Sequence, residues 1–560
     1  MIVLGFLHGH DAGSTLVIDG EIVVSIAEER LNRKKKNIAE YLKYPPIKSM
    51  LYCVNHAGIT LDDVDLFVYN KTESVRDVED FMNYTYGIDK SKFKYITHHD
   101  AHIFSTYLTS PFNKTNVVVV DAAGEDALKG NTPSWNYLLD RGYNLVDTSN
   151  MDINFTEAWT IAHLSGHSHI DTEKTWLKTI KVDMWDYLDE CSVGFLYDLG
   201  AWQLVSNFKN WPSAGKLMGL ASYADKEWVS QQERAHKIID DTLHIPHKHL
   251  HPEVTKDSDF QDRANVAGLY QREQEETTMY LVEKSKRLQD CDNISLAGGS
   301  FLNCNTNYNI ITSGLYENVH LFPSLDDTGI SIGCALWGAF KYDKLIRKDF
   351  FNPYLGRTYS DLEIHSVIRN NDKVTFFEYG NSDLLTKKVA EYLNEDKVIG
   401  WFQGGSEIGP RALGNRSILA SPRPDWMRDH INKNVKLREW YRPFAPSVLY
   451  ERQKEIFNFD YFSPYMLVTA EVVEEWRDKI PAVTHDDNTS RYQSVTPQTN
   501  EKYYKLIKEF DNLTGIPLLL NTSFNGPTEP IVETPEDALN TFLELDIDIL
   551  VMDNFVIQKK

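Results

Sequence analysis

The sequence predicts an α/β protein of two or three domains. At 560 residues the chain is too long for a single hydrophobic core. Short apolar runs at residues 2–7, 117–120 and 294–297 each end in a turn of small or acidic residues, a pattern typical of buried strands. Charged stretches with few glycines or prolines lie between these runs and favour helices. Alternation of such strands and helices indicates the α/β class.

The N-terminal segment predicts a strand followed by a hairpin. Residues 2–7 lack a basic flank, so they fit a first strand better than a signal peptide. The pair Asp19-Gly20 separates two runs that are rich in β-formers, and this pair is a strong signal for a two-residue turn. The pattern of strand and turn returns at Asp121 and, a third time, at 294–299. This recurrence is what an internally duplicated domain would show.

The later elements place a domain boundary near residue 350. The charged segment 225–290 is mostly helical in pattern, and a further helix is expected over 333–345. Turn-forming residues fill 351–360, so we divide the chain into domains at 1–350 and 360–560. In the second domain we expect a helix at 384–393, followed by strands at 398–402, 517–520 and 547–552.

Composition restricts the function classes. The formal charge of −23, from 58 basic and 81 acidic residues, argues against a duplex-DNA binder, which needs a broad basic face. Five cysteines without a C-x-x-C pair suggest free thiols in a reducing cytoplasm. No run approaches the roughly 18 apolar residues that cross a bilayer. The chain therefore fits a cytoplasmic protein that can hold a small anion in a local basic pocket.

A loop rich in glycine and arginine follows the apolar run 398–402. Residues 403–418 read QGGSEIGPRALGNRSI, with Arg411 and Arg416 five positions apart. Glycines let the backbone approach a ligand closely, and guanidinium groups match phosphate or carboxylate oxygens. The loop therefore predicts an anion site. The alternative is a turn that carries two surface arginines.

Two histidines and two aspartates form a candidate metal site. His98 and His102 are four positions apart, which on a helix puts both imidazoles on one face. Asp121 follows a buried strand, and Asp327 precedes an apolar helix. Two imidazoles with two carboxylates suit a divalent transition metal such as iron or manganese. Spacing alone does not bring the four residues together, and structural or solvated histidines are the alternative.

The loop at 403–418 resembles the QGxxExGPRALGNRSIL signature of the O-carbamoyltransferases of nodulation and antibiotic biosynthesis. The four metal candidates fall on the HHxAH, DxxGE and DTG-type motifs of that family's N-terminal domain. That domain is similar to the tRNA threonylcarbamoyl-transfer enzymes of the actin/Hsp70-like (ASKHA) superfamily. The resemblance therefore implies a duplicated actin/Hsp70-like domain at 1–350, in which the four residues hold the metal. The chain departs from the motif at Ala122, where a glycine is usual.

Two further motifs of this domain supply candidate nucleotide contacts. Lys216 lies in a segment that resembles EGKxMGLA, with Ala214 in place of the usual glutamate. Gly298, Gly299 and Asn303 match a GGxxLN segment whose backbone amides approach phosphates.

The turn after the first strand supplies the catalytic candidates. His10-Asp11 and the basic turn at 30–36 match the HD and EERxxRxK motifs of the family. The match favours Arg33 and Lys35 as pocket residues, whereas a basic run of this kind is otherwise typical of a solvated face. We expect His10 or Asp11 to accept a proton from an acceptor hydroxyl.

The second domain resembles the YrdC-like proteins, which bind ATP and form a carbamoyl-type adenylate. The Lys-x-Arg spacing would put two cations on one side of an extended strand, and a strand ending in Asn-Thr-Ser offers short polar donors. The candidate contacts to phosphate and carbonyl groups are Arg411, Arg416, Lys436, Arg438, Arg491, Asn521 and Ser523.

The resemblance implies an ATP-dependent O-carbamoyltransferase. The C-terminal domain would make carbamoyl adenylate from carbamoyl phosphate and ATP, with Mg²⁺ accompanying the ATP. The N-terminal domain would transfer the carbamoyl group to a hydroxyl of a small molecule, and a nucleoside or nucleotide is one conceivable acceptor. The acceptor and the oligomeric state stay open, and neither a membrane nor duplex DNA is an expected partner.

Two other functions compete with carbamoyl transfer. An actin-like metabolite kinase would explain the duplicated strands and the metal, but it leaves 360–560 without a role. A non-catalytic nucleotide sensor would bind ATP without turning it over. Product detection with carbamoyl phosphate separates the first two functions, and ATP–pyrophosphate exchange separates either enzyme from the sensor.

Overall fold

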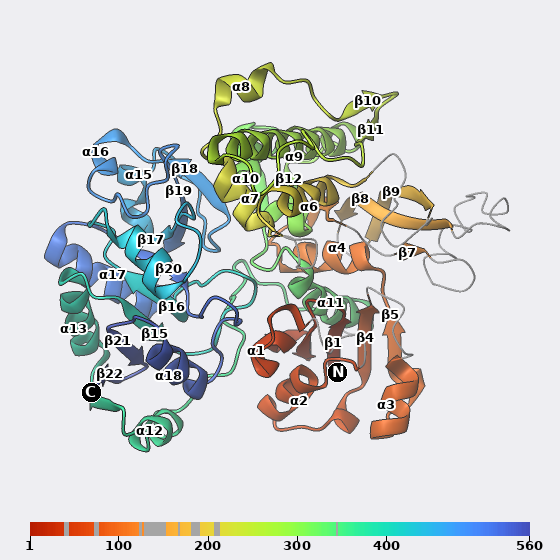
Figure 1. The fold of residues 1–560 in the computed structure, drawn as a ribbon. Coiled ribbons are helices and arrows are strands. Elements are labelled where there is room, and N and C mark those ends of the chain that lie inside the picture. Colours follow the sequence, from red (N-terminus) through yellow and green to blue (C-terminus); the bar gives the residue numbers. More distant parts are fainter. Residues whose placement is uncertain are drawn as a thin grey trace. The chain divides into compact units, whose positions relative to one another are not determined.

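The chain folds into two compact units in the computed structural model (Figure 1). The first unit contains Met1–Val23 and Ala39–Phe351, and the second contains Val24–Ile38 and Asn352–Lys560. The short segment at 24–38, which the sequence analysis assigned to the N-terminal domain, therefore belongs to the second unit. The structure describes residues 1–37, 44–71, 78–122, 126–127, 153–165, 168–180, 191–206, 213–342 and 345–560.

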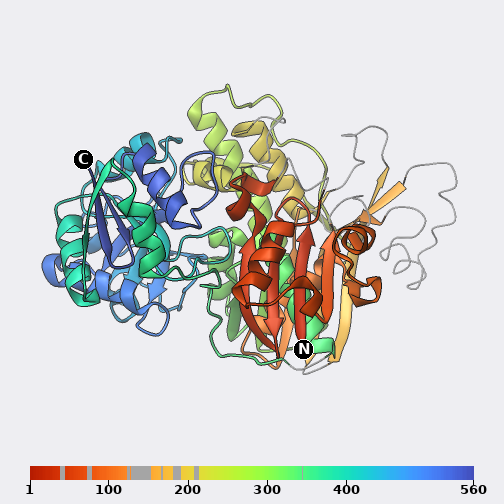
Figure 2. The same ribbon diagram turned by 90° about the horizontal axis from the view of Figure 1, so that it is seen from below.

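A five-stranded sheet opens the first unit and appears as the red and orange strands in Figure 2. Its strands lie in the order β3-β2-β1-β4-β5, where β1 pairs antiparallel with β2 and parallel with β4. Asp19 and Gly20 connect β2 to β3, and both have positive φ angles, as the expected two-residue turn requires. The bounds are β1 (Ile2–His8), β2 (Gly13–Ile18), β3 (Glu21–Ala27), β4 (Leu66–Lys71) and β5 (Phe93–Tyr95).

A second sheet repeats this topology. Its central strand β6 pairs antiparallel with β8 and parallel with β12, so the order β9-β8-β6-β12-β13 matches β3-β2-β1-β4-β5. The expected duplication is confirmed, but the pattern at 294–299 is the fourth strand of the second copy and not a third repeat. The bounds are β6 (Lys114–Val120), β7 (Asp126–Ala127), β8 (Ile153–Ser165), β9 (Ser168–Ile180), β12 (Asn293–Ala297) and β13 (Asn318–Leu321).

Two helices are exchanged between the two sheets. Helix α4 (His98–Thr109) follows the first sheet in sequence but packs against β6 and β12, and α11 (Ile330–Tyr342) follows the second sheet but packs against β1 and β4. The two helices also pack against each other. A Cβ atom on Gly333 would lie 1.9 Å from the carbonyl oxygen of Ala101, so this close crossing requires glycine.

Among the remaining elements of the first unit, α2 packs against β2 and α9 packs against β6, while α6, α7, α8 and α10 pack against α9. The segment 225–290, expected to be mostly helical, contains the long helix α9 and also a small hairpin of β10 and β11. In the described part of the chain no helix is long and apolar enough to cross a membrane. The bounds are α2 (Ile47–His56), α3 (Val78–Tyr86), α6 (Val193–Leu204), α7 (Ala214–Ala221), α8 (Lys226–Gln231), β10 (Lys237–Ile239), β11 (Thr242–His244), α9 (Phe260–Leu288) and α10 (Cys304–Thr312).

The second unit contains a nine-stranded sheet in the order β14-β22-β21-β15-β16-β20-β17-β19-β18. The expected last strand at 547–552 is followed by one more, β22, which pairs antiparallel with β21 and with β14. The bounds are β14 (Val374–Glu378), β15 (Ile399–Phe402), β16 (Arg416–Ala420), β17 (Ala445–Leu449), β18 (Val468–Glu471), β19 (Thr489–Val495), β20 (Leu518–Ser523), β21 (Ile549–Met552) and β22 (Phe555–Lys559).

Short helices accompany this sheet, and α13 packs against α17. Helix α17 ends at Gly515, whose positive φ angle of 73° lets the chain leave the helix. The bounds are α1 (Glu28–Asn32), α12 (Asp361–Arg369), α13 (Ser382–Asn394), α14 (Met427–His430), α15 (Gln453–Ile456), α16 (Glu474–Arg477), α17 (Glu501–Thr514) and α18 (Pro535–Glu544).

Candidate functional site

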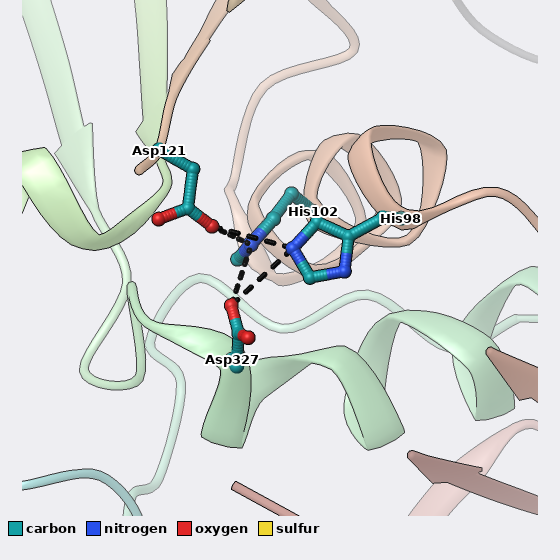
Figure 3. A group of neighbouring side chains, drawn as sticks. All are labelled: His98, His102, Asp121 and Asp327. Carbon is teal, nitrogen blue, oxygen red and sulfur yellow. Dashed lines mark hydrogen bonds and ion pairs between the residues drawn. The ribbon is translucent and has the colours of Figure 1, made fainter. Parts of the chain in front are cut away.

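The four metal candidates converge in the first unit (Figure 3). His98 and His102 lie on the first turns of α4, Asp121 follows β6, and Asp327 precedes α11. The Nε2 atom of His98 lies 3.3 Å from one carboxylate oxygen of each aspartate. The Nε2 atom of His102 lies 3.3 Å from Asp121 and 3.5 Å from Asp327. Two nitrogen and two oxygen donors therefore face one point.

The fold explains this convergence. The duplicated topology brings the end of β6 and the start of the exchanged helix α11 to the start of α4. The Nδ1 atom of His98 lies 3.3 Å from the side-chain oxygen of Asn70, which orients the ring so that Nε2 points to the carboxylates. The neighbouring His99 turns away and pairs with Thr160 at 2.8 Å. His99 is therefore not part of the quartet.

Opposite charges balance within this quartet. Burial alone would lower the pKa of His98, but the carboxylates of Asp327 and Asp121 raise it well above its usual value. Burial and mutual repulsion would raise the pKa of Asp121, but the two imidazoles lower it. Histidine nitrogens and carboxylate oxygens in this ratio fit iron or manganese, and a bound cation would take the place of the imidazole protons.

His10 and Asp11 lie beside the quartet. The Nδ1 atom of His10 lies 3.4 Å from the carboxylate of Asp11 and 3.5 Å from Oδ2 of Asp327, whose other oxygen faces the two metal-site histidines. The backbone N–H of Asp11 donates to the same Nδ1 atom at 3.0 Å. Strand β1 occupies the place in its sheet that β6 occupies in the second, so the turns after both strands reach one site. Both catalytic candidates thus lie next to a candidate metal ligand.

The glycine candidates lie against Asp121. Gly298 has a φ angle of 96°, and a Cβ atom there would lie 2.2 Å from the carbonyl oxygen of Val120. The N–H of Gly299 points to Oδ1 of Asp121 at 3.4 Å. These glycines therefore let the turns after β6 and β12 meet. Residues 123–125 of the acidic turn, which include Gly124 and Glu125 of the DxxGE motif, lie outside the described residues.

Asn303 and Lys216 lie on different elements. The side-chain oxygen of Asn303 accepts from the N–H groups of Asn305 and Thr306 and caps α10, while its amide exchanges hydrogen bonds with Gln271. These bonds show that Asn303 caps α10, and its contact with a phosphate stays a prediction. Lys216 is half-buried on α7.

Arg416 in the second unit holds the glycine-rich loop. Its side chain is fully buried, and its guanidinium donates to carbonyl oxygens of Gln403, Gly404, Asn415 and Glu533. Its charge also lies 3.6 Å from the centre of the Phe402 ring. This geometry shows that Arg416 holds the loop together, and its contact with a phosphate stays a prediction. Arg411, by contrast, remains partly exposed on the loop.

Lys436 and Arg438 follow a helical turn and not an extended strand. A π-helical turn at Ile431–Val435 precedes them, and Leu437 between them has a φ angle of 46°, which is rare for leucine. The Nζ atom of Lys436 donates to backbone and side-chain oxygens of Ser523 and Asn525, at 2.8 to 3.3 Å. The expectation of an extended Lys-x-Arg pair was therefore wrong, because the backbone reverses at the middle residue.

Like charges accumulate around Arg438. Burial lowers its pKa well below the usual value, and Arg442 and Arg491 lower it further. Burial also lowers the pKa of Lys436, followed by the charges of Arg438, Lys35 and Arg442. The structure thus places Lys35 near the cations of the second unit and adds Arg442, which the sequence analysis had not selected. Glu439 opposes this effect on Arg438, but the cations outnumber it, and an excess of positive charge is suited to an anion.

The two polar candidates on β20 differ in their contacts. The side-chain amide of Asn521 donates to the carbonyl oxygen of Ala412 and to Ser447 and Gln493. The hydroxyl of Ser523 donates to the side-chain oxygen of Asn525 at 2.6 Å. Asn521 is thus buried in the protein's own hydrogen bonds, whereas Ser523 is half-buried beside Lys436.

Comparison with protein families and curated proteins agrees with the expected family. The carbamoyltransferase N-terminus model matches residues 3–86 and 81–336, and the carbamoyltransferase C-terminus model matches 390–559. An uncharacterized Synechocystis protein, sll1178, is 30% identical over 98% of this chain and 95% of its own length. Nodulation protein NolNO of Sinorhizobium fredii is 29% identical over 98% of this chain and 79% of its own. Nodulation protein U of Bradyrhizobium diazoefficiens is 26% identical, covering 94% and 92%.

Solved structures give only distant similarities. T. kodakarensis HypF has 12% identity and a TM-score of 0.36, covering 61% of this chain and 47% of its own. A ROK hexokinase from Thermus thermophilus has 10% identity and a TM-score of 0.31, covering 60% and 98%. The assignment therefore comes from the family models and the curated relatives. The chain belongs to the carbamoyltransferase family, with both its N-terminal and C-terminal domains, and is a carbamoyl-transferring enzyme.

Proposed function

We propose that this enzyme is an ATP-dependent O-carbamoyltransferase that works in two steps. In the second unit, water would cleave carbamoyl phosphate into carbamate and phosphate, and a carbamate oxygen would attack the α-phosphorus of ATP, which gives carbamoyl adenylate and releases pyrophosphate. The first unit would then move the carbamoyl group to a hydroxyl of a small molecule. The observation that carries the proposal is the presence of two different sites, a His/Asp quartet in one unit and a cationic cluster in the other. A single-step transferase would need only one of them.

Adenylate formation suits the cationic cluster. This reaction builds negative charge on the phosphates of ATP and of the departing products, and buried cations stabilise such charge strongly. Arg442 and Arg491 are close enough to Arg438 to lower its pKa, so an anion would relieve this repulsion. Lys436 fixes the turn that contains Ser523 at the edge of this cluster.

Carbamoyl transfer suits the quartet and the turn beside it. Attack on the carbamoyl carbon by a hydroxyl oxygen requires a group that takes the hydroxyl proton, and AMP then leaves. His10 and Asp11 are partly exposed and lie beside Asp327, so one of them would accept this proton. A divalent iron or manganese ion, held by the two histidines and two aspartates, would supply Lewis-acid polarisation of a carbonyl or phosphoryl oxygen.

Pyrophosphate exchange tests the first step. Purified full-length protein with ATP, Mg²⁺ and labelled pyrophosphate should exchange label into ATP when carbamoyl phosphate is present, and not when it is left out. Exchange that does not depend on carbamoyl phosphate would refute carbamoyl adenylate as the intermediate. An ADP-forming kinase or a nucleotide sensor would give no exchange at all.

Mass spectrometry tests the second step. The enzyme, ATP and carbamoyl phosphate are incubated with a small-molecule extract, and products that gain one carbamoyl unit are sought. A hydroxyl compound that gains this unit supports O-transfer and identifies the acceptor class, including a nucleoside or nucleotide. Gain of a phosphoryl group instead would favour the actin-like kinase.

A further inference from the structure

An arginine from the N-terminal segment is built into the second unit. Arg33 ends helix α1 in the left-handed region, with a φ angle of 60°. Its guanidinium donates to the carbonyl oxygen of Ile531 at 2.7 Å, to that of Pro530 at 2.9 Å and to the carboxylate of Glu529 at 2.8 Å. Its Nε atom lies 3.5 Å from Asp537. One side chain thus fixes the turn at 529–531 and the start of α18.

This turn leads directly to Lys436. The carboxylate of Glu529 also accepts from the N–H of Gly526 at 2.6 Å, and its carbonyl oxygen accepts from the side-chain amide of Asn525 at 2.9 Å. The side-chain and backbone oxygens of Asn525 then accept from Lys436 at 2.8 and 2.9 Å. Arg33 and Lys436 therefore hold opposite ends of one hydrogen-bonded turn.

Glu529 also has an electrostatic role. Burial alone would raise its pKa, but hydrogen bonds from Gly526, Thr541 and Arg33 lower it, so the group stays ionised. Its charge opposes the loss of the proton from Lys436. By fixing this carboxylate, Arg33 favours the charged form of the lysine.

A second arginine of the same segment reaches the glycine-rich loop. Arg30 is buried and donates to the carbonyl oxygen of Gly409 at 3.1 Å. The segment that contains both arginines therefore supports two separate loops of the cationic site, at Gly409 and at 529–531. A fragment cut at residue 360 would lack these contacts.

We propose that Arg33 is a positioning residue of the cationic site, which sets Asn525 and Glu529 and through them Lys436. The proposal rests on the proposed function, because the site would be the one that forms carbamoyl adenylate. The adenylate-forming half of the enzyme then consists of 352–560 together with the segment at 24–38.

The test uses Arg33→Ala and Arg33→Lys in the full-length chain. Misplacing Lys436 slightly should lower the kcat of carbamoyl-phosphate-dependent pyrophosphate exchange by about 10- to 100-fold, with a smaller change in KM for ATP. Lysine can reach one of the acceptors but not all of them, so Arg33→Lys should recover part of the loss. Arg477→Ala is the matched control, because Arg477 also binds one backbone oxygen and one glutamate in the same unit.

Amide hydrogen exchange gives a readout that needs no activity. In Arg33→Ala the peptide covering 523–532 should exchange about 10-fold faster or more, and in Arg477→Ala it should not change. Faster exchange together with a lower kcat supports the positioning role.

Two outcomes would overturn this role. Unchanged amide exchange at 523–532 refutes it, whatever reaction the enzyme performs. A lower melting temperature with wild-type kcat also refutes it, because Arg33 then only stabilises the fold. A wild-type protein without pyrophosphate exchange would instead refute the proposed function, and the amide exchange would still decide on Arg33.

Discussion

The two candidate sites differ in how their charges are balanced. In the first unit, the carboxylates of Asp121 and Asp327 face two imidazoles at 3.3 to 3.5 Å. In the second unit, Lys436 and Arg438 donate to amide, hydroxyl and carbonyl oxygens, while further arginines lie close to them. One site pairs two imidazoles with two carboxylates, whereas in the other the cations outnumber the nearby carboxylates of Glu439 and Glu529.

This difference predicts opposite effects on stability. Paired charges attract each other in the ligand-free protein, so breaking a pair leaves an uncompensated buried charge. Like charges repel until an anion binds, so the cationic cluster should destabilise the ligand-free protein and favour ligand binding. Removing a charge from a paired cluster should therefore lower stability, whereas removing a charge from the cationic cluster should lower activity and raise the stability of the ligand-free protein.

A cluster of paired charges outside both sites gives the largest expected effect on stability, and this effect serves as a reference for the two sites. Glu273 is buried and contacts His236 at 2.7 Å and Arg272 at 3.0 Å. Burial would raise its pKa, but these bonds lower it from 4.5 to about 2. A lowered carboxyl pKa adds stability that is present above the unfolded value and is lost as the pH falls towards 2. The contribution is roughly 3 kcal/mol.

Glu273→Gln should therefore remove this acid dependence. The difference in unfolding free energy between wild type and variant, measured by urea denaturation, should stay nearly constant from pH 6 to about pH 5 and then shrink as the pH falls to 3. A difference that stays constant over this range would mean that Glu273 contributes by shape and not by charge.

Arg491 tests the cationic cluster through activity. Arg491→Ala should remove a charge-assisted contact worth about 1.5–3 kcal/mol, which at the upper figure lowers adenylate formation by on the order of 100-fold. Arg491→Lys should restore little if the guanidinium binds phosphate through two nitrogens. Metal content and transfer from supplied carbamoyl adenylate should stay unchanged. Pyrophosphate exchange at the wild-type rate in the alanine variant would make Arg491 an ordinary surface charge.

His102 tests the quartet through metal binding. His102→Ala should weaken metal affinity by roughly 10-fold or more, because one of four donors is lost. Transfer of the carbamoyl group should fall while adenylate formation persists. The control is His99→Ala, since His99 pairs with Thr160 and lies on the same helix. If His102→Ala keeps as much metal as His99→Ala and the wild-type protein, by elemental analysis, the quartet is not the metal site.

The sequence predicted residue types better than their roles. His98 and His102 were predictable because four positions on a helix fix two side chains on one face. Asp327 lies more than 200 positions away, so only the family resemblance or the fold could join it to them. The carbonyl partners of Arg416 could not be predicted, because a guanidinium matches backbone carbonyl oxygens as well as phosphate and only the fold shows which of them surround it. Its contact with a phosphate stays a prediction. The prediction that Lys436 and Arg438 lie on an extended strand was wrong because Leu437 between them has a positive φ angle, and no local sequence pattern predicts this conformation for leucine.

Arg438 gives the smallest expected effect and the sharpest contrast. Arg438→Met keeps much of the volume and removes one buried charge from a mainly cationic cluster. It also removes hydrogen bonds to Asn432 and to the carbonyl oxygen of Pro443, and the contact with the Phe444 ring. Relief of the repulsion from Arg442 and Arg491 should outweigh these losses. We expect the ligand-free variant to be more stable by about 1 kcal/mol, measured by urea denaturation, while adenylate formation falls.

The same measurement on Asp121→Asn, with metal removed, should show a loss of stability, because two imidazoles lose a buried carboxylate. If Arg438→Met also loses stability, repulsion among the arginines does not destabilise the ligand-free protein. The two sites would then not differ in how their charges affect stability.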